Sequence, residues 1–178
     1  MKIGVISDTH GSVRAWEHAY DRFLSQTDLI IHCGDILYHG PRNPLPDGYN
    51  PAVLFERLNA LAHPLLLVRG NCDAEVDQMV LDFPLEAPYT HLFTGDYRIL
   101  VHHGHVELPA KAKKGYDLII SGHTHLPGIK EEDGVIYLNP GSPALPKDEQ
   151  ETPTLAVIDG REIVIWNLKT GEAFQRWR

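Results

Sequence analysis

Short, continuous apolar runs recur along the chain, and each run is followed by polar residues and a glycine. The runs cover residues 3–6, 29–31, 65–68, 99–101 and 118–120. Runs of this length, without alternating polar positions, are typical of strands that are buried on both faces. The pattern therefore predicts a sheet whose strands lie in the interior of the protein.

Helical spacing of apolar residues fills the intervals between the first three runs. Residues 13–23 have an apolar stripe at i, i+3 and i+4 positions, with Ser12 as the expected N-cap. Residues 52–62 repeat this spacing. The order strand–helix–strand–helix–strand predicts parallel strands that are joined by right-handed crossovers.

After residue 85 the pattern changes to short segments with hairpin turns. Asp133-Gly134 precedes an apolar segment at 135–138, and Asp159-Gly160 separates the segments 155–158 and 162–168. An Asp-Gly pair between apolar segments is a strong hairpin signal. Together with the parallel units this predicts an α/β protein with mixed sheets, and we expect residues 1–178 to form a single domain.

The composition excludes several classes of protein. The chain has 16 Lys and Arg against 24 Asp and Glu, a formal net charge of −8, which argues against binding nucleic acid or an anionic membrane by charge alone. Its two cysteines argue against a disulfide scaffold. Because no segment has the length of a membrane span or the pattern of a signal peptide, we expect a soluble protein in the reducing cytoplasm.

Side chains that could bind a metal or a ligand follow the ends of the apolar runs. Histidine is unusually frequent, with 11 copies in 178 residues. Ligands of open α/β sheets bind outside the carboxyl ends of the strands. We therefore expect the polar side chains that follow the runs to converge. They are Asp8, His10, Asp35, Asn71, His103, His123 and His125.

This set of imidazoles, carboxylates and one carboxamide suits Mn, Fe, Co, Ni or Zn better than Ca or Mg. Seven ligands are too many for one open tetrahedral ion and fit two ions that share a carboxylate. Two ions about 3.5–4 Å apart can hold a bridging hydroxide and clamp a phosphoryl oxygen for in-line attack. The residues thus point to a two-metal phosphoesterase.

The same blocks, in the same order and with the same spacing, resemble the signature of the calcineurin-like metallophosphoesterases. The blocks are Asp8-x-His10, Gly34-Asp35, Gly70-Asn71-x-Asp73, His103 and Gly122-His123-x-His125. Residues 34–43 and 69–79 further resemble the YfcE-type branch of bacterial phosphodiesterases. The resemblance extends from the first strand to the Asn139-Pro140-Gly141-Ser142 loop, and the last thirty or so residues match only in general pattern.

This resemblance implies a four-layer α/β/β/α sandwich of two mixed sheets and a dinuclear centre, usually activated by manganese. It implies that one ion is held by Asp8, His10 and His125, the second by Asn71, His103 and His123, and that Asp35 bridges the two. It also implies a phosphodiesterase that uses a metal-bound hydroxide on small-molecule or aryl phosphodiesters. Dimers or larger homo-oligomers, including tetramers, are common among such proteins.

Cys72 departs from the pattern of most of the family, which has His at this position to assist the leaving group and contact the phosphate. The YfcE-type branch also has Cys here. A thiol is mostly protonated at neutral pH, but it is a weak hydrogen-bond donor. We therefore expect aryl phosphodiesters, which have good leaving groups, to be favoured over alkyl monoesters.

Three further residues are candidates for contact with the substrate. Arg42 could bind a phosphate bidentately, and His39 lies in the same proline-rich loop; for Arg42 the alternative is an exposed loop cation. His105 could orient a ligand or the phosphate. By contrast, His32 is expected to be a core or interface residue, and His102 is expected to point away from the centre because side chains alternate along a strand.

Two other functions remain open. The retromer scaffold subunit of eukaryotes has the implied fold and binds protein partners, so a metal-poor, protein-binding scaffold is the main alternative. Competent ligands at all seven positions favour catalysis over this alternative. A nuclease is disfavoured by the net charge of −8.

Overall fold

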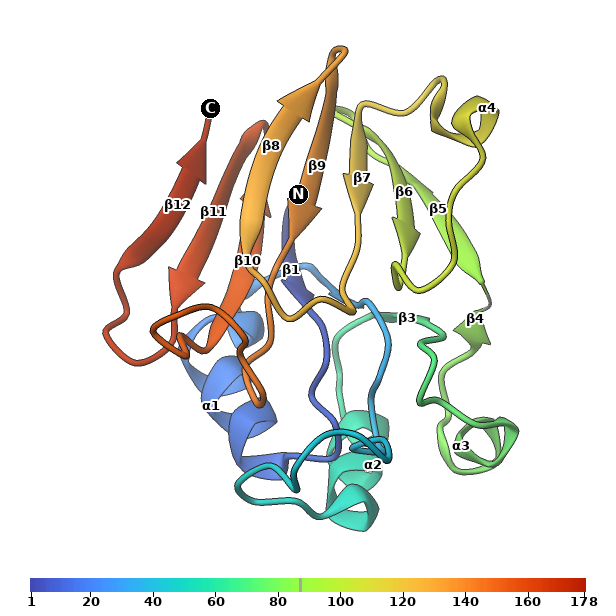
Figure 1. Ribbon diagram of the computed structural model, residues 1–178, viewed down its shortest axis with the longest axis vertical. Coiled ribbons are helices and arrows are strands. Elements are labelled where there is room, and N and C mark those ends of the chain that lie inside the picture. Colours follow the sequence, from blue (N-terminus) through green and yellow to red (C-terminus); the bar gives the residue numbers. More distant parts are fainter. Residues whose placement is uncertain (87) are drawn as a thin grey trace.

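The computed structural model describes residues 1–86 and 88–178, which form two mixed β-sheets with their inner faces packed together (Figure 1). The larger sheet has the order β12-β11-β10-β1-β2-β3-β4. Its strands are β1 (Lys2–Ile6), β2 (Leu29–His32), β3 (Leu65–Val68), β4 (Leu85–Glu86), β10 (Thr154–Asp159), β11 (Glu162–Asn167) and β12 (Ala173–Trp177). Strands β1, β2 and β3 pair in parallel, which confirms the prediction from the alternating strand and helix patterns.

The smaller sheet has the order β5-β6-β7-β9-β8. Its strands are β5 (Tyr89–Phe93), β6 (Arg98–His102), β7 (Leu118–Ile120), β8 (Gly128–Glu132) and β9 (Val135–Asn139). Strand β7 is parallel to both of its neighbours, β6 and β9, whereas β5 and β8 run antiparallel at the two edges. The carboxyl ends of β6 and β7 therefore lie side by side.

The helices follow from local sequence signals. Helix α1 (Val13–Arg22) begins at the expected cap, where Ser12 Oγ accepts a hydrogen bond of 3.1 Å from the Ala15 amide. Helix α2 (Pro51–Asn59) ends earlier than the expected residue 62. Ala60 caps it, with its amide donating to the carbonyl oxygens of Glu56 and Leu58.

Three short helical segments complete the chain. They are the 3₁₀ turn η1 (Leu24–Gln26), helix α3 (Glu75–Val80) and the single turn α4 (Ala110–Lys113). Among the described residues, no helix is both long enough and apolar enough to cross a membrane.

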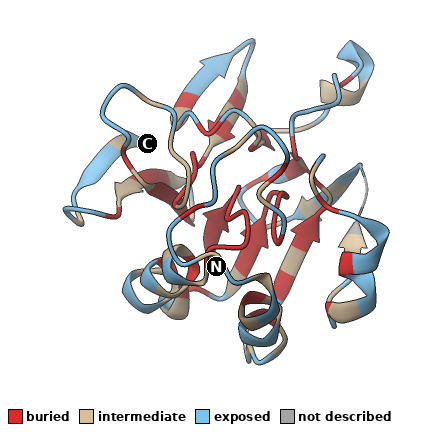
Figure 2. Cartoon of the chain, turned by 60° about the horizontal axis from the view of Figure 1, so that its bottom comes forward, coloured by how far each residue is buried: buried red, intermediate tan, exposed pale blue. Residues whose placement is uncertain are grey.

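Alternation along the strands creates two cores. Side chains such as Val5 and Ile31 point between the sheets and meet Val101 and Ile120 of the smaller sheet. Their neighbours Ile6 and Ile30 on the same strands point the other way, toward helices α1 and α2, and pack with Trp16, Leu54 and Leu58. Figure 2 shows these strands buried along most of their length, with the outer faces of the helices exposed.

The layer that covers the outer face of the smaller sheet, the fourth of the sandwich, is thin. On the outer face of the smaller sheet, Leu100 and Ile119 pack against Leu108, which precedes α4. The fold is the predicted α/β sandwich of two mixed sheets with helices, and it leaves one end of both sheets open for the loops that follow the parallel strands.

Both predicted hairpins are present, with different turns. Asp133 and Gly134 form the two-residue loop between β8 and β9, and both have positive φ angles, as a type I′ turn requires. Asp159 instead pairs with Glu162, so the loop between β10 and β11 consists of Gly160 and Arg161.

Candidate metal centre

The strand ends that carry the predicted ligands meet at one place. Asp8 and His10 follow β1, Asp35 follows β2, Asn71 follows β3, His103 follows β6, and His123 and His125 follow β7. Backbone hydrogen bonds tie the first two loops together, since the amides of Asp8 and His10 donate to the carbonyl oxygens of Gly34 and Asp35, both at 3.0 Å. The convergence expected from the sequence is therefore present.

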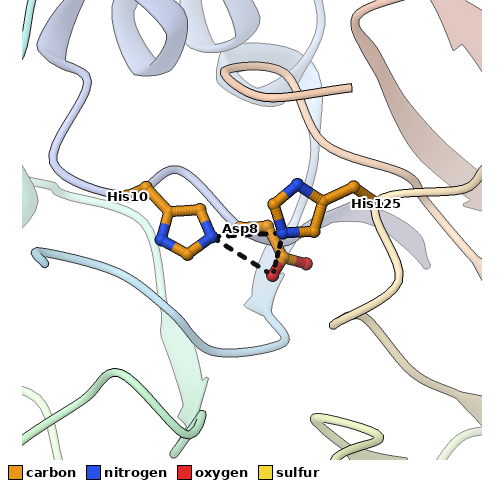
Figure 3. Close-up of side chains that lie close together, drawn as sticks. All are labelled: Asp8, His10 and His125. Carbon is orange, nitrogen blue, oxygen red and sulfur yellow. Dashed lines mark hydrogen bonds and ion pairs between the residues drawn. The ribbon is translucent and has the colours of Figure 1, made fainter. Parts of the chain in front are cut away.

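One carboxylate oxygen of Asp8 faces the imidazoles of His10 and His125 (Figure 3). Its Oδ2 accepts hydrogen bonds from Ser7 Oγ at 2.6 Å and from the His123 amide at 2.9 Å. Its Oδ1 is buried without a hydrogen-bond partner among the described residues, 3.2 Å from His125 Nε2 and 3.6 Å from His10 Nε2. A buried anionic oxygen without a partner is costly unless a cation compensates its charge, so this geometry fits a metal ion.

The histidine tautomers point to the same conclusion. The Nδ1 atoms of three rings face carbonyl oxygens, which can only accept, so each Nδ1 carries a hydrogen and each neutral ring keeps a lone pair on Nε2. The pairs are His10 with Tyr38 at 2.9 Å, His103 with Cys33 at 2.7 Å, and His125 with Leu145 at 2.5 Å. The Nε2 atoms of His10 and His125 are only 3.2 Å apart. Lone pairs that are held in this way are arranged to coordinate a cation.

The electrostatics of the centre favour positive charge. Burial opposes ionisation of Asp8, but the nearby imidazoles of His10 and His125 outweigh it and hold the pKa of this carboxyl well below its usual range. Burial likewise opposes a charge on His103, yet Asp35 and Asp8 raise the pKa of its imidazole to about 9. The carboxylates therefore stay ionised and attract either protons or metal ions.

Asp35 lies between two subsets of ligand atoms. Its Oδ2 is 3.7 Å from His10 Nε2, and its Oδ1 is 3.4 Å from His103 Nε2. Ligand atoms within 4.8 Å of one another form three groups in the described chain: Asp8 with His10 and His125, Asp8 with Asp35 and His103, and His10 with Asp35 and Cys72. The position of Asp35 fits the bridging role that the resemblance implies.

Asn71 and His123 lie at the rim of the centre. Asn71 Oδ1 is 3.2 Å from His103 Nε2, and the ring of His123 is 5.1 Å from that of His103, measured between centroids. Both side chains are near the second subset, and their role as ligands stays a prediction.

The loops that carry the ligands are strained. Five of the seven predicted ligands have positive φ angles, which are uncommon outside glycine: Asp8, His10, Asp35, His123 and His125. Such backbone costs on the order of 1–3 kcal/mol per residue and clusters at functional sites. The surrounding fold thus holds these side chains in place at the expense of stability.

Two glycines allow the loops to approach one another. A Cβ atom on Gly70 would overlap Asp35 Oδ1, and one on Gly122 would overlap Ser7 Oγ. These positions need glycine because a side chain here would displace the carboxylate of Asp35 or the Ser7 hydroxyl that donates to Asp8.

Asp73 is a residue whose role the sequence did not reveal, although it belongs to the third block. Its Oδ2 accepts hydrogen bonds from the amides of Asp35 at 2.8 Å and Gly70 at 2.6 Å, and its Oδ1 accepts one from the Ile36 amide at 2.7 Å. Burial raises the pKa of this carboxyl to about 6, against the effect of the three donors. Asp73 joins the loops after β2 and β3 and thereby positions Asp35.

A cavity of about 730 Å³ opens over the centre. Its lining residues include Asp35, Asn71, Cys72, His123, His125, Arg42 and Lys147. Lys147 was not identified from the sequence, because it lies far along the chain from every block. Burial and the neighbouring Asp35 raise the pKa of the Cys72 thiol to about 12, so this side chain is neutral.

The other candidates for substrate contact are less central. His39 does not line this cavity, because its ring packs against those of Tyr38 and Tyr49, with centroids 4.7 and 5.3 Å away. His105 lines a neighbouring cavity of about 250 Å³, with its ring 5.4 Å from that of His103. The buried His32 is held by Thr9 Oγ1 at 2.9 Å, as expected of a packing residue.

The chain has two mixed sheets, and at their strand ends buried carboxylates and imidazoles are arranged to coordinate a cation. This combination is typical of the class of metal-dependent phosphoesterases. The comparison with family models is specific: the calcineurin-like phosphoesterase superfamily domain matches residues 1–162. The chain belongs to this superfamily.

Relatives support this membership. The chain is 44% identical over 152 residues to phosphodiesterase YfcE of Escherichia coli strain K12, which covers 83% of this chain and 82% of the relative. A solved structure of the E. coli phosphoesterase YfcE has a TM-score of 0.91 and 38% identity, and covers 99% and 98% of the two chains. Vps29 from Entamoeba histolytica, solved in complex with Zn²⁺, has a TM-score of 0.67 at 20% identity over 99% and 98%, which shows a shared fold alone.

Proposed function

We propose that the protein is a phosphoric diester hydrolase that acts on small-molecule or aryl phosphodiesters with two divalent ions at this centre. The observation that carries the proposal is the buried Asp8 Oδ1, which has no hydrogen-bond partner among the described residues and faces Nε2 of His10 and of His125. The likeness to YfcE, whose name states a phosphodiesterase, supports the same activity. Mn²⁺ is our first choice of ion, before Fe, Zn, Co or Ni.

Different residues of the chain have different roles in the proposed reaction. Divalent ions, when bound, supply a nucleophile at neutral pH and neutralise charge on the phosphoryl group. Asp35 faces both ligand subsets and keeps them at a fixed separation. Arg42 and Lys147 bring positive charge to the cavity above and can bind the anionic phosphate. Cys72, which lines this cavity, would donate a weak hydrogen bond to the departing ester oxygen.

The partners follow from the same reasoning. We propose a small-molecule substrate, neither nucleic acid nor membrane, because the net charge of −8 provides no attraction for a phosphate backbone. A homo-oligomer, dimer or tetramer, a cytoplasmic location and a single domain over residues 1–178 complete the proposal, on the basis of the family resemblance and of the sequence.

Metal dependence is the first test. Chelator-stripped protein is expected to be inactive, and added Mn²⁺ is expected to restore hydrolysis of bis-p-nitrophenyl phosphate at rates well above those for p-nitrophenyl phosphate. Absorbance of the released nitrophenolate measures both rates. If folded protein turned over neither ester with any divalent metal, the proposal would be wrong and the protein-binding scaffold of the same fold would be favoured.

A second prediction concerns Cys72. Cys72→His is expected to raise the ratio of monoester to diester hydrolysis by about tenfold, because an imidazole donates a proton to a leaving oxygen better than a neutral thiol does; general acids contribute about 10²–10⁴-fold in full. Cys72→Ser is the matched control, since a hydroxyl is similar in size and does not titrate near neutral pH. Unchanged rates and an unchanged ratio in Cys72→His would contradict this account of Cys72.

A further inference from the structure

We call the cavity of about 730 Å³ over the centre the metal cavity. A second cavity of about 390 Å³ lies beside it and has a more apolar lining. Helices α2 and α3 and the loop after β2 form its walls, and most of its lining is apolar, including Leu37, Tyr49, Phe55, Val76 and Val80. Val76 is 58% exposed although it is apolar. We call this cavity the apolar pocket.

The apolar pocket and the metal cavity share two walls, Cys72 and Tyr38. Both walls are fixed to the predicted ligands: the Cys72 amide donates to Asp35 Oδ1 at 2.8 Å, and His10 Nδ1 donates to the Tyr38 carbonyl oxygen at 2.9 Å. Cys72 Sγ also lies within 4.8 Å of ligand atoms of His10 and Asp35. The apolar pocket therefore adjoins the metal cavity at the predicted ligands.

Two hydrogen bonds hold the helices that form the apolar pocket in place. The Asn59 side chain, at the end of α2, donates to the Val80 carbonyl oxygen at 2.8 Å and accepts from the Asp82 amide at 2.9 Å. These two bonds hold the ends of α2 and α3 together, and the two helices lie next to each other in Figure 1. Binding would thus cost little rearrangement, which favours affinity.

The charges around the two cavities differ. Arg42 and Lys147 line the metal cavity, whereas Asp77 is the one charged side chain among the lining residues identified for the apolar pocket in the described chain. Asp77 is nearly buried, and its Oδ2 accepts from the Ala74 amide at 2.8 Å. A carboxylate in this position repels a second anionic group, so the pocket suits an uncharged occupant.

We propose that the apolar pocket receives an uncharged, apolar ester group of the substrate. The substrates are then phosphodiesters with at least one aromatic or similarly bulky apolar ester group, rather than diesters whose two ester groups are small or charged. This inference rests on the proposed function, which places the phosphate at the metal centre.

Phosphonates separate the phosphate site from the pocket, because phenylphosphonate and methylphosphonate share the same anionic head. Calorimetric titration of the Mn²⁺-loaded protein is expected to show phenylphosphonate binding about tenfold more tightly than methylphosphonate, because the ring buries apolar surface. Ala52→Phe, which fills the pocket from α2, is expected to abolish this preference and leave methylphosphonate binding within about twofold. Ala60→Phe, at the end of the same helix and outside the pocket lining, is the matched control and is expected to keep the preference.

A second pair of variants covers the case in which Ala52→Phe fails to fold. Val76→Lys brings a charge to the pocket wall, whereas Met79→Lys changes a residue of the same helix that is 83% exposed and does not line the pocket. We expect only Val76→Lys to lose the preference for the phenyl group. Equal binding of both phosphonates by the unmodified protein, or an undiminished preference in folded Ala52→Phe or Val76→Lys, would overturn the pocket assignment even if diester hydrolysis is observed. Failure of the proposed function would look different, with no metal-dependent hydrolysis of any diester.

Discussion

Asp8→Asn is expected to lower kcat/KM for a phosphodiester by about 10³-fold, close to 4 kcal/mol of transition-state stabilisation. The reason lies in the hydrogen bonds of the carboxylate. Ser7 Oγ and the His123 amide both donate to Oδ2, so an asparagine must place its oxygen there and turn its NH₂ group toward His10 and His125. An NH₂ group cannot coordinate a cation, and the variant loses a ligand without losing volume.

The measurement is metal content together with steady-state rates. Dialysed Asp8→Asn should retain less metal per chain than the unmodified protein, and its activity should not recover at ordinary Mn²⁺ concentrations. Asp21→Asn, an exposed carboxylate on α1, is the matched control and should leave both quantities unchanged. If Asp8→Asn kept full metal content and a rate within tenfold of the unmodified protein, Asp8 would not be a ligand.

The position of the centre could be predicted because the topology is simple. Strands β1, β2 and β3 run in parallel, so the residues after each of them must lie at the same edge of the sheet. In the sequence each of these strands is followed within three residues by an Asp or Asn, and a glycine lies close by. His103 and His123 come from the other sheet. The rule for strand ends included them in the predicted set, but it does not determine how the two sheets pack, and their position depends on that packing.

Other features of the centre could not be read from the sequence. The lone pair on His125 Nε2 depends on the carbonyl of Leu145, twenty residues away, and the positive φ angles of Asp8 and Asp35 depend on the loops around them. The apolar pocket joins Leu37, Phe55 and Val76 from three separate segments, and α3 itself is too short to produce a clear periodic pattern. Tertiary packing decides each of these features.

Asp73 offers a test of how strongly the fold supports the centre. Asp73→Ala is expected to lower the free energy of unfolding by about 3 kcal/mol, because it leaves the buried amides of Asp35, Ile36 and Gly70 without their acceptor; each such loss costs about 1–3 kcal/mol. The total stays below the sum of three such losses because the variant no longer buries a carboxylate whose pKa is raised to about 6. Denaturant unfolding of the metal-free variant measures the change.

The same variant should also impair catalysis while it is folded, because the Asp35 backbone loses the contact that positions its carboxylate between the two ligand subsets. We expect a tenfold or larger fall in kcat with a smaller change in KM, and weaker retention of Mn²⁺ on dialysis. Asp148→Ala is the matched control, since this more exposed carboxylate also accepts a backbone hydrogen bond, from the Thr152 amide at 2.7 Å, but water can replace it. A destabilised Asp73→Ala with normal kcat and normal metal retention would limit Asp73 to holding the loops together. A variant as stable as the unmodified protein would show that the amides find other acceptors. The conclusion that Asp73 joins the loops after β2 and β3 would then be rejected.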